Sequence, residues 1–180
     1  MTMSKTITHL LLAILSMALL VAASNELVKH PINDWLTWGA LTYPFTFFIT
    51  DICNRKFSIN FARKVIYAGF IVGVLLSIFI DIRIAIASGS AFLIAQLIDA
   101  QIFNMLKSRA IFWWVAPFTS SMVGAIFDTV LFFSIAFYGT GLPWVSWGVG
   151  DFAVKSGLIL LALLPYRLLL PWLKSEYKTA

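Results

Sequence analysis

Six long apolar runs, separated by short polar segments, make up most of the chain. An α-helix needs about 20 apolar residues to cross the hydrocarbon core of a bilayer, and each run comes close to that length. The pattern predicts six transmembrane helices at about 7–23, 36–53, 65–80, 84–106, 115–138 and 151–172. We therefore predict one all-α polytopic membrane domain that covers residues 1–180.

Composition supports this interpretation and excludes several function classes. Hydrophobic residues make up 61% of the chain and charged residues 12%, and the mean hydropathy is +0.91, whereas about a quarter of the residues in a soluble domain are charged. The net charge of +5 does not indicate a nucleic-acid partner, because the basic residues lie at helix ends. The single cysteine, Cys53, and the widely separated His9 and His30 predict no disulfide, metal site or cofactor.

The distribution of basic residues predicts the topology. With both termini in the cytoplasm, nine basic residues lie inside and only Lys29 and Arg83 lie outside, as the positive-inside rule requires. The inside set is Lys5, Arg55, Lys56, Arg63, Lys64, Lys107, Arg109, Lys174 and Lys178. The polar segments 24–36 and 139–150 are then outer loops, and 54–64 is a cytoplasmic loop.

The fifth apolar run contains an aspartate, Asp128, near its middle. A carboxyl group at that depth is costly and persists where it faces a partner, a cavity or a ligand. Small residues lie beside it, among them Ser120, Ser121 and Gly124, and they allow another helix or a flat solute to approach closely. Asp128 is therefore a candidate binding residue, and the alternative is a structural ion pair between two helices.

The second apolar run contains Pro44 and several aromatic residues. Proline removes a backbone hydrogen bond and predicts a kink or a break, and broken helices often hold the substrate in transporters. The aromatic candidates for stacking are Trp38, Tyr43 and Phe45; a kinked helix in lipid is the alternative. Asp51, followed by Arg55 and Lys56, is interpreted as a member of an interfacial ion pair, although it is kept among the candidate site residues.

Two further pairs of polar residues lie within predicted helices. Gln96 and Asp99 are three residues apart and share one helix face, which indicates either a binding site or a hydrogen-bonded clamp between helices. Asp151 and Lys155 are four residues apart and can pair along the last helix, or Lys155 can reach toward Asp128. Pro165 is expected to interrupt that helix.

The usual enzyme signatures are missing from the sequence. It has no Gly-rich phosphate loop, no HExxH motif, no Gly-x-Ser-x-Gly elbow and no Cys/His cluster, and we expect no catalytic activity. Buried carboxylates, an amide, a lysine and many aromatic rings suit a flat, polar solute that is neutral or cationic.

The order of several motifs resembles that of the queuosine precursor transporter family, also called the vitamin uptake transporter family. The motifs are Ser24-Asn25, TWGALTYPF, FFITD, FARK, QLIDAQIFN, WWVAPFTSS, GAIFDT, DFAVK and LLPYRLLL. The resemblance implies a bacterial inner-membrane importer of 7-deazaguanine bases for queuosine salvage. It also implies six helices in a fold similar to the substrate-binding subunits of energy-coupling-factor vitamin transporters.

The resemblance suggests where a base would bind. Asp128, or Asp99 with Gln96, would accept the ring N–H and the exocyclic amine, and an aromatic ring of the second run would stack on the base. Lys155 and Asn25 complete the candidate set. The chain departs from the family pattern at Ala125 and Phe127, and in the short 81–83 segment.

Three interpretations follow from these features. The leading one is a facilitator or secondary carrier of a queuosine precursor, and homo-oligomers are compatible with it. The second is a binding subunit for another heterocyclic solute that docks through Ala18 and Ala22 to an ATP-driven energising module. The third is a purely structural protein, in which Asp128, Asp99 and Lys155 are replaceable by apolar residues.

Overall fold

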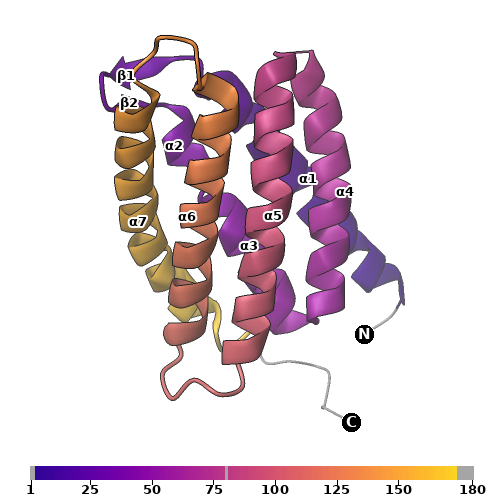
Figure 1. Cartoon of the computed structure of the whole chain (residues 1–180). Helices are drawn as coiled ribbons and strands as arrows, with labels where there is room; N and C mark the ends of the chain where they lie inside the picture. The colour runs from indigo at the N-terminus through magenta and orange to yellow at the C-terminus, as the bar shows by residue number, and fades with distance from the viewer. Residues whose placement is uncertain (1–2, 80, 174–180) are drawn as a thin grey trace.

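The computed structural model of the chain describes residues 3–79 and 81–173, without the side chains of residues 3–5. Long helices lie side by side in one bundle, and a small hairpin lies at one end of it (Figure 1). In chain order the elements are α1 (Met3–Leu27), β1 (Pro31–Asn33), β2 (Leu36–Thr37), α2 (Gly39–Thr42), α3 (Phe45–Lys56), α4 (Ile59–Ile78), α5 (Ile82–Leu106), α6 (Val115–Phe137) and α7 (Trp144–Leu169).

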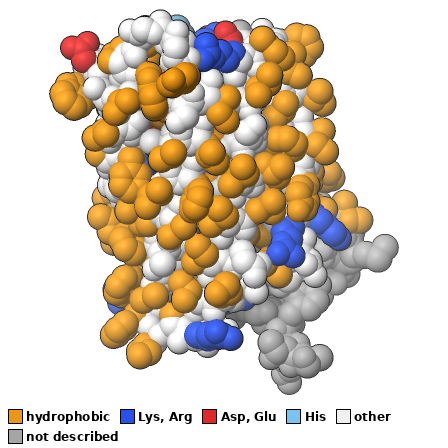
Figure 2. Space-filling view, in the orientation of Figure 1, with side chains coloured by type: hydrophobic (Ala, Val, Ile, Leu, Met, Phe, Trp, Pro, Cys, Tyr) orange, Lys and Arg blue, Asp and Glu red, His pale blue; other side chains and the backbone are white. Residues whose placement is uncertain are grey.

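Five of these helices, α1, α4, α5, α6 and α7, are long and apolar enough to cross a membrane. Apolar side chains cover the middle of the visible face, and charged side chains lie mainly toward its two ends (Figure 2). An aqueous protein would not expose such a continuous apolar band. The chain is therefore a multi-pass membrane protein.

The antiparallel hairpin corrects the all-α prediction in one detail. β1 lies inside the predicted outer loop 24–36 and pairs with β2 at the start of the predicted helix 36–53, with Pro31 opposite Thr37. The loop is also shorter than predicted, because α1 continues to Leu27. The last turn of α1 contains Asn25 and Glu26, which are polar, so the apolar run ended before the helix does.

The other helix boundaries also differ from the apolar runs. α7 begins at Trp144 rather than at 151, so the turn before it covers only 138–143, where Gly139 and Gly141 take positive φ values of 77° and 76°. α3 extends to Lys56, and Ser58 caps α4 by accepting a hydrogen bond from Phe61 N at 3.2 Å. The predicted cytoplasmic loop 54–64 is therefore mostly helical.

Pro44 breaks the second span as predicted, whereas Pro165 does not break the last one. Pro44 has no backbone N–H to donate, so the helical hydrogen bonding is interrupted between α2 and α3. At this break Thr46 N donates to Tyr43 O, three residues earlier, at 2.9 Å. α7 runs through Pro165 to Leu169. Membrane helices tolerate such prolines where the surroundings accommodate the freed carbonyl.

Some predictions fall beyond the described residues. Ile80, at the end of the predicted helix 65–80, lies outside them, as do Lys174, Lys178 and the side chain of Lys5.

The broken span formed by α2 and α3 occupies the centre of the bundle. α3 contacts α1, α4, α5, α6 and α7, while α2 contacts α1 and α7. In Figure 1 the two short helices lie behind α5 and α6 and between α7 and α1. Four polar residues of α3 are therefore buried against other helices: Thr46, Thr50, Asp51 and Asn54.

A seam of small residues on α4, Gly69, Gly73 and Ser77, joins this helix to α1. A Cβ atom at Gly73 would lie 3.0 Å from Val21 Cγ1, and one at Gly69 would lie 2.6 Å from Met17 Cγ. One turn further, Asn25 Nδ2 donates to Ser77 Oγ at 2.6 Å. The two helices thus touch through backbone and short side chains, which is the contact that stabilises helix pairs in membranes.

This seam generates a stability prediction. Gly73→Leu should lower the unfolding free energy by about 1–3 kcal/mol, since the new side chain meets the stiff, β-branched Val21. The matched control is Gly157→Leu, because a Cβ at Gly157 would meet nothing within 4 Å. Thermal unfolding in detergent measures both variants. Equal midpoints for the two would contradict tight α1–α4 packing.

Candidate substrate-binding site

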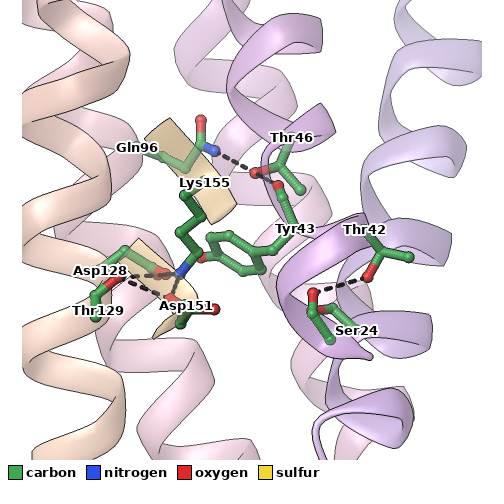
Figure 3. Close-up of polar contacts among 10 residues, drawn as sticks. Ser24, Thr42, Tyr43, Thr46, Gln96, Asp128, Thr129, Asp151 and Lys155 are labelled. Carbon is green, nitrogen blue, oxygen red and sulfur yellow. Dashed lines mark hydrogen bonds and ion pairs between the residues drawn. The ribbon is translucent and has the colours of Figure 1, made fainter. Parts of the chain in front are cut away.

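A buried lysine lies between two carboxylates in the interior of the bundle. Lys155 Nζ of α7 is 2.7 Å from Asp128 Oδ2 of α6 and 2.5 Å from Asp151 Oδ2, one turn earlier on α7. Thr129 joins them, donating to Asp151 Oδ2 at 2.8 Å and accepting from Lys155 at 3.2 Å. We call these four residues the lysine network (Figure 3).

The lysine network is shielded from solvent and lipid. Lys155 is 2% exposed, Asp128 3% and Asp151 4%. Burying a charge is costly unless it is paired, and here two carboxylates share one ammonium group. With both carboxylates ionised, the network carries a net charge of −1. Such a site favours a ligand that brings N–H donors or a positive charge.

Tyr43, at the break between α2 and α3, supplies an aromatic wall. Lys155 Nζ lies 4.9 Å from the centroid of its ring, within the range of a cation–π contact. The Tyr43 hydroxyl is buried without a hydrogen-bond partner among the described residues. The break at Pro44 thus places a ring with a free polar tip beside the charged groups.

A cavity of about 20 Å³ borders the lysine network. Its walls come from five helices, and its lining residues are Ser24, Asn25, Val28, Gly39, Tyr43, Ser88, Asp128, Phe132, Asp151 and Lys155. A space of this size holds about one water molecule. A larger ligand therefore requires Lys155 or a neighbouring side chain to move.

The hairpin lies close to this cavity. A Cβ atom at Gly150 would overlap the backbone carbonyl of Trp35, which follows β1. Gly150 immediately precedes Asp151, so the hairpin packs on α7 at the level of the lysine network. Only glycine allows this approach, because any side chain there would displace the hairpin backbone.

A second polar cluster lies deeper in the bundle. Asp51 of α3 and Asp99 of α5 are both buried, and the Ser121 hydroxyl of α6 lies 3.4 Å from Asp51 Oδ2 and 3.4 Å from Asp99 Oδ1. We call Asp51 and Asp99 the aspartate pair. The predicted interfacial ion pair of Asp51 is wrong, because Asp51 is 2% exposed and has no ion-pair partner among the described residues.

Gln96 bridges α5 and α3. Its amide Nε2 donates to Thr46 Oγ1 at 2.8 Å, and Thr50 Oγ1 donates to Gln96 Oε1 at 2.6 Å. This is the clamp between helices that the sequence left open as an alternative. Gln96 and Asp99 do share the face of α5 that packs on α3, as their spacing predicted.

Comparison with known proteins connects this geometry to a family. Residues 37–82 and 80–169 match the model of a family described as "Putative vitamin uptake transporter". The chain belongs to this vitamin uptake transporter family.

Curated relatives of this family member cover most of its length. It is 33% identical to a "Probable queuosine precursor transporter" of Haemophilus influenzae, over 81% of this chain and 79% of the relative. It is 32% identical to the "Queuosine precursor transporter" of Escherichia coli, over 82% of this chain and 79% of the relative. A "Probable queuosine precursor transporter" of Bacillus subtilis is 29% identical over 72% and 69% of the two chains. No solved structure matches the chain.

The fold gathers some of the candidate residues of this family member and separates others. Asp128, Lys155, Tyr43 and Asn25 border the first cavity. Asp51, Asp99 and Gln96 form the deeper layer. Trp38 and Phe45 are 50% and 49% exposed, so neither ring is buried with the two clusters.

Sequence reasoning left several contributing residues out of the site. Asp151 was predicted to pair with Lys155 but was not counted as a site residue, although its i, i+4 spacing was the signal. Thr129 adjoins Asp128 and could have been found from that position. Tyr166, 1% exposed with an unpartnered hydroxyl, gave no signal, because its relation to Asp51 depends on how α7 packs.

The lysine network predicts an asymmetric response to mutation. Lys155→Met leaves two buried carboxylates without their cation and should cost roughly 3–5 kcal/mol of stability. Combining it with Asp128→Leu and Asp151→Leu, which preserve the branched shape, should restore most of that loss. Thermal unfolding in detergent measures both variants. If Lys155→Met alone were as stable as the unmodified protein, the lysine network would not be charged.

Proposed function

We propose that the protein imports a queuosine precursor, a base of the 7-deazaguanine type, across the bacterial inner membrane. One observation carries the proposal: an ammonium group is held between two buried carboxylates beside an aromatic ring, at the break of the central span. The names of the relatives agree with this substrate. Broken membrane helices are common substrate sites in transporters.

The chemistry of the base suits the lysine network. A deazaguanine presents a ring N–H and an exocyclic amine side by side, and one carboxylate can accept both. Asp128 or Asp151 can take this edge once Lys155 turns away from it, so the base replaces one ion-pair contact with two charge-assisted hydrogen bonds. Tyr43, already beside Lys155, is placed to stack on the ring.

The hairpin and the Phe47 ring would then confine the solute from opposite sides. The hairpin packs against α7 at Gly150 on the side of α2. The Phe47 ring lies on the opposite side, where a Cβ atom at Gly124 would be 2.7 Å from Phe47 Cε1. Movement of these two barriers in turn would give alternating access to the lysine network.

The chain has no nucleotide-binding loop, so we propose that it works as a facilitator or secondary carrier. Salvage enzymes that trap the base would then favour net uptake. The relatives are named as transporters, which fits a protein without catalytic activity.

The proposed topology has six spans and cytoplasmic termini. The broken pair α2 and α3 adds a sixth crossing to the five long helices. The described basic residues Arg55, Lys56, Arg63, Lys64, Lys107 and Arg109 lie at the ends of α3 to α6 that join each other on one side of the bundle. The positive-inside rule assigns that side to the cytoplasm.

The alternative, a binding subunit of an ATP-driven vitamin importer, loses one supporting feature. Ala18, proposed as part of its docking face, is 1% exposed and packs inside the bundle. The likeness to energy-coupling-factor subunits and the formation of homo-oligomers stay predictions.

Uptake in cells tests the proposed function. A strain that lacks both precursor synthesis and its own importer is fed a limiting 7-deazaguanine base, and queuosine in its tRNA is measured. The unmodified chain should restore queuosine. Asp128→Asn should reduce the initial rate at least tenfold, because losing a charge-assisted hydrogen bond to the base costs about 1.5–3 kcal/mol.

Two controls separate the outcomes. Asp34→Asn, in the exposed turn of the hairpin, makes the same chemical change away from the site and should transport normally. The triple variant of the lysine network should be stable but inactive. If that triple variant transports as well as the unmodified chain, the network is only structural. If the unmodified chain, present in the membrane, restores nothing with any 7-deazaguanine base, the substrate assignment is wrong.

A further inference from the structure

The aspartate pair is not explained by solute binding at the lysine network. Asp51 is 2% exposed and Asp99 is 0% exposed, and both lie 3.4 Å from the Ser121 hydroxyl. The two carboxylates are therefore separated by at most twice this distance. Like charges so close in an apolar interior strongly disfavour simultaneous ionisation.

No cation of the described chain neutralises this pair. The ion pairs within the described residues involve only Glu26, Asp128 and Asp151 on the acidic side. Asp51 Oδ1 and Asp99 Oδ2 are buried without a hydrogen-bond partner. A buried oxygen atom without a partner is costly, and a bound proton or other cation would relieve this cost.

A third polar group without a hydrogen-bond partner among the described residues, the Tyr166 hydroxyl, belongs to a residue that lines the cavity beside Asp51. This residue is 1% exposed. Tyr166 lines a cavity of about 20 Å³ together with Asp51 and Ser121. The rest of the lining is apolar: Pro44, Phe47, Phe48, Pro117, Ile159, Ala162 and Leu163. The space suits one water molecule.

The other charged groups nearby make no ion pair with Asp51 or Asp99 within the described residues. Arg55, one turn beyond Asp51 on α3, lies near Lys107 and near the Tyr166 hydroxyl, and Lys107 donates to Asn54 O at 3.1 Å. Arg167 of α7 lies over the Trp113 ring at 5.5 Å. Cys53 packs in an apolar cluster with residues of α1 and α4, among them Met17, Ala62 and Val65.

From this arrangement we propose that the aspartate pair binds a proton that enters the cell together with the solute. A proton needs no coordination shell, and two carboxylates near one hydroxyl are a setting in which a single proton is shared. The proposal rests on the proposed transport function, and it assigns that function an energy source: the proton gradient.

Contacts along the broken span connect the aspartate pair to the lysine network. Tyr43, Phe47 and Asp51 are spaced by four residues and therefore share one face of the broken span. The Tyr43 and Phe47 rings meet edge to face with centroids 6.1 Å apart, and Phe47 lines the cavity beside Asp51. A base that displaces Tyr43 would thus move Phe47 and change access to the proton site.

Proteoliposomes test the coupling. Purified protein is reconstituted with the membrane potential clamped at zero, and a labelled 7-deazaguanine base is followed in two assays. Solute exchange at equal pH reports binding and translocation alone. Net uptake with the outside more acidic reports coupling, and one proton per neutral solute would allow accumulation of about tenfold for each pH unit.

Asp51→Asn, Asp99→Asn and the double variant should keep exchange but lose accumulation driven by the pH gradient. The matched control is again Asp34→Asn, which should accumulate like the unmodified protein. Accumulation driven by a sodium gradient instead of a pH gradient would overturn the proposal. Exchange without any accumulation in the unmodified protein, or full accumulation by the double variant, would also overturn it.

An infrared measurement in the absence of solute tests whether the aspartate pair holds a proton. The unmodified protein at neutral pH should show the carbonyl stretch of a buried protonated carboxyl group, and the double variant should lose it. No such band in the unmodified protein overturns the proposal. If the unmodified protein neither binds nor exchanges any base, the transport function has failed, and the infrared result still shows whether the pair holds a proton.

Discussion

The ion pairs of Lys155 with Asp128 and Asp151 are the interaction on which the rest of the structure depends. Three ionisable groups are held away from water, and their burial is tolerated only while each has a partner. Meeting this requirement brings α6 and α7 together at a fixed register. It also leaves one more carboxylate than ammonium groups, so the network favours a ligand with N–H donors or positive charge.

The broken central span turns this network into a site. Pro44 divides α2 from α3, and Tyr43 at the break reaches Lys155. Further along α3, Phe47 packs against Gly124, and Asp51 reaches the Ser121 hydroxyl. Ser121 and Asp128 are seven residues apart on α6, about 10 Å along the helix axis. The broken span therefore contacts both polar clusters, through Tyr43 at the break and through Asp51 of α3, so the two clusters can influence each other through this span.

Hydrophobic runs predicted the order of the five long helices, and the break at Pro44, because length and proline chemistry are local properties. The ends of α1 and α7 and the hairpin were missed, since polar residues there continue a helix or pair as strands. Asp128 and Lys155 were identified because a buried charge is conspicuous in an apolar run. Asp51 was misplaced, because Arg55 and Lys56 follow it in sequence, whereas its actual neighbours, Asp99 and Ser121, come from other helices.

The most direct test of this account is a structure of the protein with a 7-deazaguanine base bound. The account predicts that the base edge lies within hydrogen-bond distance of Asp128 or Asp151, that Lys155 has left that carboxylate, and that Tyr43 contacts the ring. A base bound elsewhere, for example in the apolar groove of about 440 Å³ between α6 and α7, with the lysine network unchanged, would contradict it.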